Sequence, residues 1–390
     1  MMHVNMLYGH LTDFDLSNFY HQHNVLSDPK EILYDIEKIV RRRAEISDSL
    51  LNARVFINNG TRDDFGYSVS NHPPYDEENL NEWLQRITGA TSFCAVINGI
   101  NGWSDTLSER INRDFNRQWV SRYGIPSQGI DVYTFMGKYR LTPFGIHKDQ
   151  EHTFLYHLGP GIKKAWVWDP RHMDIAPLVQ SDSFNLRQTL SWAHAIILRP
   201  GDALFIPQNW YHVLENPEFS VTLGVAPYEK KRKELLTSFL TDVLSDCPYD
   251  DSAVNINPCV LDNMNEYIAS IVPEDLAKTN LYHVAQMGLS NLLGRLRSNH
   301  FFKYSSPPRK IIHKNYSYFG DFIIGEEKGD AMKIYLRGKE FIVSKKLKSC
   351  MQELNETISS YNFSYRVDGE KSEDCFDQII MKMITAGVLI

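Results

Sequence analysis

The sequence predicts a mainly β core with flanking α-helices, on the strength of two observations. Between residues 129 and 227, short runs rich in Val, Ile, Phe, Tyr and Trp alternate with turns of Gly, Pro and Asp, which is typical of an all-β sandwich or barrel. On both sides of this stretch, apolar residues recur at the three- and four-residue spacing of amphipathic helices. Because 390 residues exceed the usual size of one domain, we expect further domains around the β core.

The composition indicates a soluble, folded protein. Hydrophobic residues make up 43% and charged residues 23% of the chain, as in ordinary globular proteins. A formal net charge of −7 provides no general attraction to nucleic acid or to an anionic membrane. The five cysteines are scattered and never form a CxxC pair, so we expect a cytoplasmic location without a disulfide framework. The sequence shows no export signal and no apolar stretch long enough for a membrane anchor.

The N-terminal third of the chain predicts two helices and one strand. Helical spacing runs from about residue 29 to 51, with an arginine run at 41–43 on its polar end. This run could contact nucleic acid, but a solvated helix end is the stronger interpretation in an acidic chain. Residues 90–99 predict a strand, and residues 106–124 predict a helix that ends at a glycine.

Six strands are expected in the core, followed by helices and then by a small α+β segment. The strands are expected at 131–137, 152–159, 164–170, 194–202, 203–208 and 220–227. Helical patterns follow at 228–246, 263–272, 274–278 and 284–298, and 298–310 is typical of a linker. Residues 332–344 predict a hairpin that turns at Arg337-Gly338, with Ser344 as the N-cap of a helix. A last helix is expected at 375–386.

Three residues of the β core predict a metal site. His147 and Asp149 stand two apart, so on a strand their side chains point the same way. His212 closes a Pro-Gly-Asp turn and a hydrophobic strand further along the chain. Two histidines and one carboxylate on one face of a metal leave open positions, as in non-haem iron(II) oxygenases. A hydrogen-bonded pair of His147 and Asp149 is the structural alternative.

Other histidines are weaker candidates for metal ligands. A second HxD triplet, His172 to Asp174, follows a turn outside any good strand pattern, so we interpret it as a surface loop. His152 and His157 lie near the first triplet in sequence, but extra ligands would fill the coordination positions that an oxygenase leaves open.

Residues 130–170 and 198–227 resemble the JmjC-type cupin core of 2-oxoglutarate oxygenases. The resemblance is closest to the bacterial ribosomal-oxygenase branch, whose members hydroxylate protein side chains. The shared features are the Gln150 that follows the HxD triplet, the strand that begins with Phe154, the basic pair before Trp166, and the Pro-Gly-Asp turn with its closing Trp-Tyr-His run.

This resemblance implies a fold and a division into four parts. The core is expected to be a double-stranded β-helix of the cupin, or jelly-roll, type, and the C-terminus a winged-helix-like α+β domain. The four parts are residues 1–128 as an N-terminal helical and strand flank of the catalytic domain, 129–228 as the core, 229–305 as a helical, dimerising segment, and 306–390 as the winged-helix-like domain. The first helix after the core carries an apolar stripe that a homodimer contact or the barrel would cover: Leu235, Leu236, Phe239, Leu240 and Val243.

The resemblance also implies an oxidoreductase with defined cofactors. Iron(II) would be held by His147, Asp149 and His212, and 2-oxoglutarate and O2 would be cosubstrates. The distal carboxylate of 2-oxoglutarate needs a buried cation, and the family's position for it is matched by Lys163. Lys164 is the competitor, because neighbouring residues of a strand face opposite ways. Hydroxyl groups that could assist in binding the cosubstrate belong to Tyr133, Thr142, Thr153 and Thr222.

The expected reaction is hydroxylation of a C–H bond in a peptide or protein side chain, with release of succinate and CO2. One alternative is a hydroxylase of a free amino acid or natural-product intermediate. Another alternative is a ligand-binding cupin regulator that acts through its winged-helix-like domain. Such a regulator would need a basic recognition helix, and the only candidate for one in the sequence is residues 345–348. The sequence fits both hydroxylation and N-demethylation, and it fits more than one prime substrate. We expect a protein partner and a homodimer, and neither a membrane nor nucleic acid.

Overall fold

The computed structural model describes residues 15–57, 60–170, 186–245, 280–308, 315–316, 322–349, 352 and 365–366. Several expectations lie outside these described residues. They are the helices at 263–272, 274–278 and 375–386, most of the helix after Ser344, and the second HxD triplet at His172 and Asp174.

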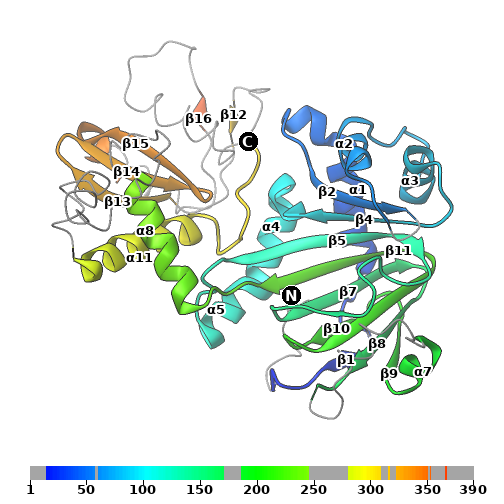
Figure 1. Ribbon diagram of the computed structural model, residues 1–390. Coiled ribbons are helices and arrows are strands. Elements are labelled where there is room, and N and C mark those ends of the chain that lie inside the picture. The colour runs from blue at the N-terminus through cyan, green and yellow to red at the C-terminus, as the bar shows by residue number, and fades with distance from the viewer. Residues whose placement is uncertain are drawn as a thin grey trace, which may run out of the picture.

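A large antiparallel sheet dominates the fold (Figure 1). Its strands follow the order β1 (Tyr20–Gln22), β10 (Ala203–Ile206), β7 (Thr153–Pro160), β11 (Tyr211–Pro227), β5 (Ile130–Tyr139), β4 (Phe93–Asn98), β2 (Asn52–Ile57) and β3 (Gly60–Thr61). A shorter layer pairs with the first part of β11 and consists of β6 (His147–Lys148), β8 (Lys163–Trp168) and β9 (His194–Leu198).

Strand β11 joins the two layers. Its residues 211–215 pair with β8, and its residues 220–227 lie between β5 and β7. The register shifts between Asn216 and Ser220, where the strand passes from one layer to the other. The result is a β core of the cupin, or jelly-roll, type with helices around it, so the predicted core and its flanking helices are confirmed.

The large sheet also includes strands from the N-terminal flank. Strand β1 pairs with β10, and β4 and β2 continue the sheet beyond β5. The expected boundary between residues 128 and 129 therefore falls inside one continuous sheet. The division into four parts stays a prediction.

The predicted N-terminal helices are present. Helix α1 (Pro29–Ile46) has Asp28 as its N-cap, whose side chain accepts from the backbone N–H of Lys30, and the buried face of the helix includes Ile32 and Ile36. Helices α2 (Asp63–Asn71) and α3 (Leu80–Thr88) were not predicted, and α3 begins with a capping box. The helix expected at 106–124 runs through α4 (Asp105–Ile111), a π-turn (Asn112–Asn116) and α5 (Arg117–Tyr123). It ends at Gly124, whose φ of 87° suits a glycine.

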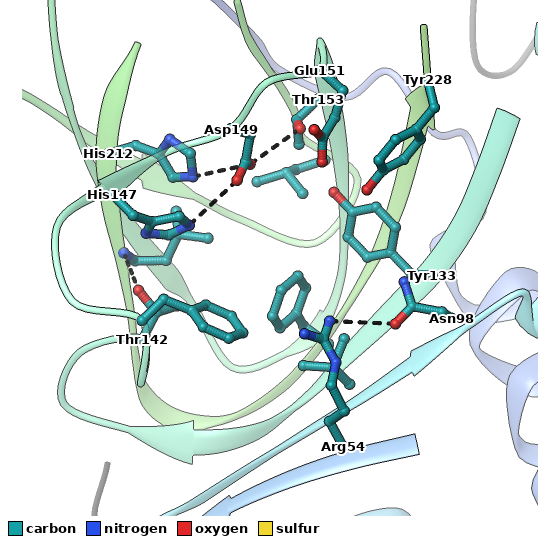
Figure 2. Close-up of a pocket in the computed structure, with 15 residues that line it drawn as sticks. Arg54, Asn98, Tyr133, Thr142, His147, Asp149, Glu151, Thr153, His212 and Tyr228 are labelled. Carbon is teal, nitrogen blue, oxygen red and sulfur yellow. Dashed lines mark hydrogen bonds and ion pairs between the residues drawn. The ribbon is translucent and has the colours of Figure 1, made fainter. Parts of the chain in front are cut away.

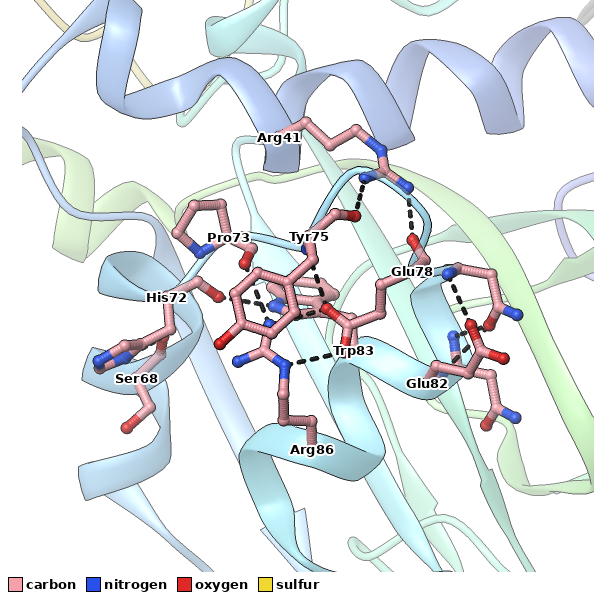
Figure 3. A network of polar contacts seen from close by, with 11 residues as sticks. Arg41, Ser68, His72, Pro73, Tyr75, Glu78, Glu82, Trp83 and Arg86 are labelled. Atoms are coloured by element: carbon pink, nitrogen blue, oxygen red, sulfur yellow. Dashed lines mark hydrogen bonds and ion pairs between the residues drawn. The ribbon is translucent and has the colours of Figure 1, made fainter.

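In the arginine run at 41–43, two side chains make polar contacts and the third is buried, and Figure 3 shows the contacts of Arg41. Arg41 donates to the backbone carbonyl groups of Tyr75 and Glu78, so it holds the loop before α3. Arg42 pairs with a glutamate one turn further along α1, and Arg43 is only 4% exposed. The run is therefore not a free basic surface.

The helix after the core packs on another helix. Phe239 of α8 (Arg232–Ser245) is buried against Val284 of α11 (Leu281–Ser298), together with Leu235 and Leu240 from the same stripe. A Cβ on Gly288 would lie 2.3 Å from the Phe239 ring, so only glycine permits this close approach. In the described residues the apolar stripe of α8 is thus covered by α11, whereas the expected partners were a second copy of the chain or the barrel.

The predicted hairpin is confirmed. Strands β13 (Phe322–Lys328), β14 (Ala331–Leu336) and β15 (Lys339–Ser344) form an antiparallel sheet. Arg337 and Gly338 connect the last two strands with φ values of 46° and 77°, as in a two-residue hairpin turn. The side chain of Ser344 accepts from the N–H of Lys346, at the start of a 3-10 turn (Lys345–Leu347). Two short strands, β12 (Asn315–Tyr316) and β16 (Tyr365–Arg366), also pair.

The segment expected as a linker is packed into the fold. The carbonyl of Phe301 accepts from the N–H of Ile130 at 2.7 Å, and the N–H of Lys303 donates to the carbonyl of Ile130 at 2.9 Å. Phe302 is only 4% exposed. The guanidinium of Arg337 also reaches Asp105 of α4 at 2.6 Å, so the C-terminal sheet contacts the helices of the N-terminal flank.

Within the described residues, no helix combines the length and apolar character needed to cross a membrane.

Candidate metal centre

The pairing of β6 with β11 brings the two histidines of the predicted metal site together. His147 and His212 are direct cross-strand partners, and Asp149 follows β6 immediately (Figure 2). The carbonyl of Asp149 accepts from the N–H of Asn209 at 2.7 Å, which fixes the loop. Nε2 of His147 lies 3.7 Å from Oδ1 of Asp149, and Nε2 of His212 lies 3.5 Å from Oδ2. One ligand atom from each residue lies within 4.8 Å of the other two, so the three could hold one metal ion.

Backbone carbonyl groups orient both imidazoles. Nδ1 of His147 lies 3.0 Å from the carbonyl oxygen of Gly145, and Nδ1 of His212 lies 3.1 Å from that of Trp210. These contacts assign Nδ1–H as the donor on each ring, and they leave the Nε2 lone pair facing Asp149. Hydrogen bonds of this kind fix the tautomer of metal-binding histidines.

Burial keeps the imidazole of His212 neutral. Burial, followed by the nearby His147, lowers the pKa of His212 to about 3. Burial also raises the pKa of Asp149, although His147 and a hydrogen bond from Thr153 oppose the rise. A cation between the three side chains would favour the ionised carboxylate and the neutral imidazoles, which is the protonation state that metal binding requires.

The three side chains face a pocket of about 290 Å³. Three of the four predicted hydroxyl residues line it, namely Tyr133, Thr142 and Thr153. Thr222 is not part of the wall, and its hydroxyl group instead contacts Nδ1 of His157 at 3.3 Å. The structure thus brings the first three near the candidate ligands and leaves Thr222 away from them.

Lys163 and Lys164 face opposite sides of β8. Nζ of Lys163 is fully buried and donates to the hydroxyl group of Tyr139 at 2.9 Å. Nζ of Lys164 lies 3.4 Å from Glu215, and its side chain is 36% exposed. Lys163 does not line the pocket, but Phe135 does, and Nζ of Lys163 lies 5.8 Å from the centroid of the Phe135 ring. Burial lowers the pKa of Lys163 to about 8.

His152 and His157 have other partners. Nδ1 of His152 accepts from the N–H of Gln208 at 3.2 Å, and Nε2 of His157 lies 2.6 Å from the carbonyl oxygen of Gly161. Burial lowers the pKa of both imidazoles to about 4. Both side chains therefore serve the packing of the barrel, and neither belongs to the group of candidate ligands.

Four polar residues of the pocket were missed by the sequence analysis. Arg54 of β2 and Asn98 of β4 lie together on one wall, where the guanidinium approaches Asn98 Oδ1 at 3.4 Å (Figure 2). Glu151 and Tyr228 lie on another part of the wall, and burial together with a hydrogen bond to Glu151 raises the pKa of Tyr228. Glu151 stands two residues after the HxD triplet and could have been noticed. The other three are placed by strand pairings that no local pattern reveals.

Residues 112–235 match the family model described as the JmjC domain. This part of the chain is therefore similar to JmjC domains. All three candidate metal ligands and Lys163 lie within the matched residues. The comparison with curated proteins finds no match.

Solved structures of the ribosomal oxygenase YcfD from Escherichia coli are similar to the whole chain. One, in complex with cobalt and succinic acid, is 15% identical with a TM-score of 0.46, and one in complex with cobalt and 2-oxoglutarate is 16% identical with the same score. A third structure of YcfD is 16% identical with a TM-score of 0.48. Each comparison covers 97% of this chain and 96% of YcfD.

Proposed function

We propose that this chain is an iron(II)- and 2-oxoglutarate-dependent dioxygenase that hydroxylates a C–H bond of a peptide or protein side chain and releases succinate and CO2. One observation carries the proposal: in a region similar to JmjC domains, two imidazole Nε2 atoms and one carboxylate converge on a pocket from one side. Such a set leaves coordination positions open, which fits iron(II) in an oxygenase. Bound iron(II) would supply the activation of dioxygen.

The residues of the chain would position the reactants. His147, Asp149 and His212 hold the ion, and the carbonyl groups behind the imidazoles fix their direction. The buried ammonium group of Lys163 would pair with the distal carboxylate of 2-oxoglutarate. In the described part of the chain no carboxylate approaches this ammonium within ion-pair distance, and the hydroxyl of Tyr139 is its hydrogen-bond acceptor. A dicarboxylate cosubstrate would supply the charge that a buried cation lacks.

A macromolecular substrate is favoured by the architecture. The polar groups of Arg54, Glu151 and Tyr228 line the pocket beside the candidate metal ligands and could bind a side chain with its backbone. The long segment after Pro227 far exceeds a lid for a small molecule. The regulator alternative loses support, because Lys345 and Lys348 both pair with Glu327, which offsets part of the positive charge of residues 345–348.

The decisive experiment for this function measures the cosubstrate and the product. Purified protein supplied with iron(II) and ascorbate should convert 2-oxoglutarate to succinate slowly, because uncoupled turnover occurs without the prime substrate. Intact-mass proteomics of cells with and without the gene should then show one peptide heavier by an oxygen atom. A protein that binds iron(II) and 2-oxoglutarate but produces no succinate with any cellular peptide fraction would contradict the proposal.

We also propose that the chain forms a homodimer through α11. Leu281, Tyr282 and Leu289 are 54%, 74% and 46% exposed on this helix. Tyr282 and Leu289 stand seven residues apart, so they share one face of the helix, where a second copy of the chain could cover them. Light scattering should give twice the chain mass at micromolar concentration. The double variant Tyr282→Asp and Leu289→Asp should be monomeric, whereas Ile342→Asp, at an equally exposed site on β15, should stay dimeric. A wild-type monomer would defeat this proposal.

A further inference from the structure

Strand β1 pairs with β10 at one edge of the large sheet (Figure 1). Where β1 meets the turn before β10 lies a second group of side chains that could hold a metal ion. It consists of His21, His23 and Asp202, with one ligand atom from each within 4.8 Å of the other two. His21 lies in β1 and His23 follows the last residue of this strand, and their ring centroids are 4.3 Å apart, so the two imidazoles lie side by side. Asp202 belongs to the Pro-Gly-Asp turn that leads into β10. Nothing in the proposed oxygenase chemistry uses these residues.

The distances between these ligand atoms suit a small tetrahedral ion. Nε2 of His21 lies 3.4 Å from Oδ2 of Asp202, and Nδ1 of His23 lies 3.0 Å from the same oxygen. In a tetrahedral site with metal–ligand bonds near 2.0–2.2 Å, neighbouring ligand atoms are about 3.3–3.6 Å apart. Both imidazole–carboxylate distances therefore need only small shifts to fit one ion, and the ligand atoms of the two imidazoles lie within 4.8 Å of each other.

Hydrogen bonding alone does not account for the cluster. Oδ2 of Asp202 already accepts from the N–H of Arg199 at 2.9 Å, and Oδ1 accepts from the N–H of Asn24 at 3.1 Å. If both imidazoles also donated to Oδ2, three donors would compete for the two lone pairs of one oxygen. Burial acts to raise the pKa of Asp202, but the two backbone N–H groups and the two imidazoles lower it overall, so the carboxylate is ionised.

The cluster is also accessible from solvent. The side chain of Asp202 is 2% exposed, that of His21 is 20% exposed and that of His23 is 65% exposed. His23 also lines an open cavity of about 300 Å³, so solvent reaches the cluster from this side. Neutral imidazole and carboxylate are ligands that zinc and its neighbours in the first transition row accept.

We propose that His21, His23 and Asp202 form a second metal site, which binds a divalent transition-metal ion of the zinc type and clamps β1 onto the turn before β10. The backbone already joins these segments, because the N–H of Leu26 donates to the carbonyl of Gly201 at 3.0 Å. An ion would add a cross-link between residues that lie far apart in the sequence. The site is independent of the proposed oxygenase function.

Metal stoichiometry tests this site in the full-length protein. Chelator-treated protein is dialysed against Zn²⁺ or Co²⁺, and bound metal is measured by mass spectrometry. Wild-type protein should bind two equivalents, the Asp149→Ala/His212→Ala variant one, and the His21→Ala/His23→Ala variant one. Removing two of its three protein ligands should weaken the second site by more than about 100-fold. His283→Ala, which changes an exposed histidine of α11 outside both clusters, should keep two equivalents.

The outcomes separate this site from the proposed iron site. The proposal is overturned if Asp149→Ala/His212→Ala protein binds no metal, or if His21→Ala/His23→Ala protein keeps two equivalents. Asp202 is left unchanged in the variants because its carboxylate also anchors the turn. The single variant His23→Ala changes a largely exposed side chain, and it should lower the affinity of the second site without changing the circular dichroism of the protein.

Discussion

Replacement of His212 by alanine should lower the conversion of 2-oxoglutarate to succinate by at least about 100-fold, since even residues that only support metal ligands cost about 10–100-fold. The imidazole is buried, is held by the carbonyl of Trp210, and directs Nε2 toward Asp149. Alanine removes one of the three candidate ligands, so the iron content of the protein should fall together with turnover. His147→Ala and Asp149→Ala should have the same effect, measured by succinate release and by bound iron.

Controls for this experiment separate metal loss from unfolding. The backbone pairing of β6 with β11 does not depend on the imidazoles, so circular dichroism of the variants should remain close to that of the wild type. Variants of the second HxD triplet, His172→Ala and Asp174→Ala, should keep near-wild-type turnover. Full activity in His212→Ala, or loss of iron in His172→Ala, would show that the metal site was assigned to the wrong residues.

Much of the β core could be predicted because its signals are local. Alternating apolar residues and turn residues place each predicted strand, and the two-residue period of a strand separates a buried Lys163 from a more exposed Lys164. The HxD triplet and the later His212 were also visible, although their meeting depends on the pairing of β6 with β11. The local sequence pattern thus identified the candidate metal ligands, whereas the strand pairing determines how they are arranged in space.

What the sequence did not reveal depends on contacts between distant segments. Strands β1, β4 and β2 join the large sheet from the N-terminal flank, so Arg54 reaches the pocket from a part of the chain with no motif. The apolar stripe of α8 could be recognised, but its partner α11 could not, because helical periodicity defines a buried face without identifying what covers it. The sequence could not show that the hydroxyl group of Thr222, a candidate for cosubstrate binding, contacts His157 and does not line the pocket.

Replacement of Lys163 by alanine should weaken the apparent affinity for 2-oxoglutarate by about 10- to 100-fold, because a charge-assisted hydrogen bond contributes roughly 1.5–3 kcal/mol. Iron binding should be retained, since Lys163 is not among the candidate ligands. Lys163→Met should have a similar effect while filling more of the buried space. Lys164→Ala is the matched control, because the neighbouring ammonium pairs with Glu215, and its 2-oxoglutarate dependence should match the wild type.

The pH dependence of 2-oxoglutarate binding should identify Lys163 independently. Burial lowers its pKa from 10.5 to about 8, and only the protonated amine can pair with a carboxylate. The affinity of wild-type protein should therefore be constant below about pH 8 and fall by up to about tenfold per pH unit above it. Lys163→Met should bind weakly at every pH without this inflection. If Lys163→Ala leaves both the affinity and its pH profile unchanged, the cosubstrate carboxylate must pair with Lys164 or another group.

The burial of Lys163 should also affect stability. Between about pH 8 and 10.5 the unfolded chain keeps the proton on the Lys163 amine, whereas the folded chain has released it, so the free energy of unfolding should rise with pH in that range.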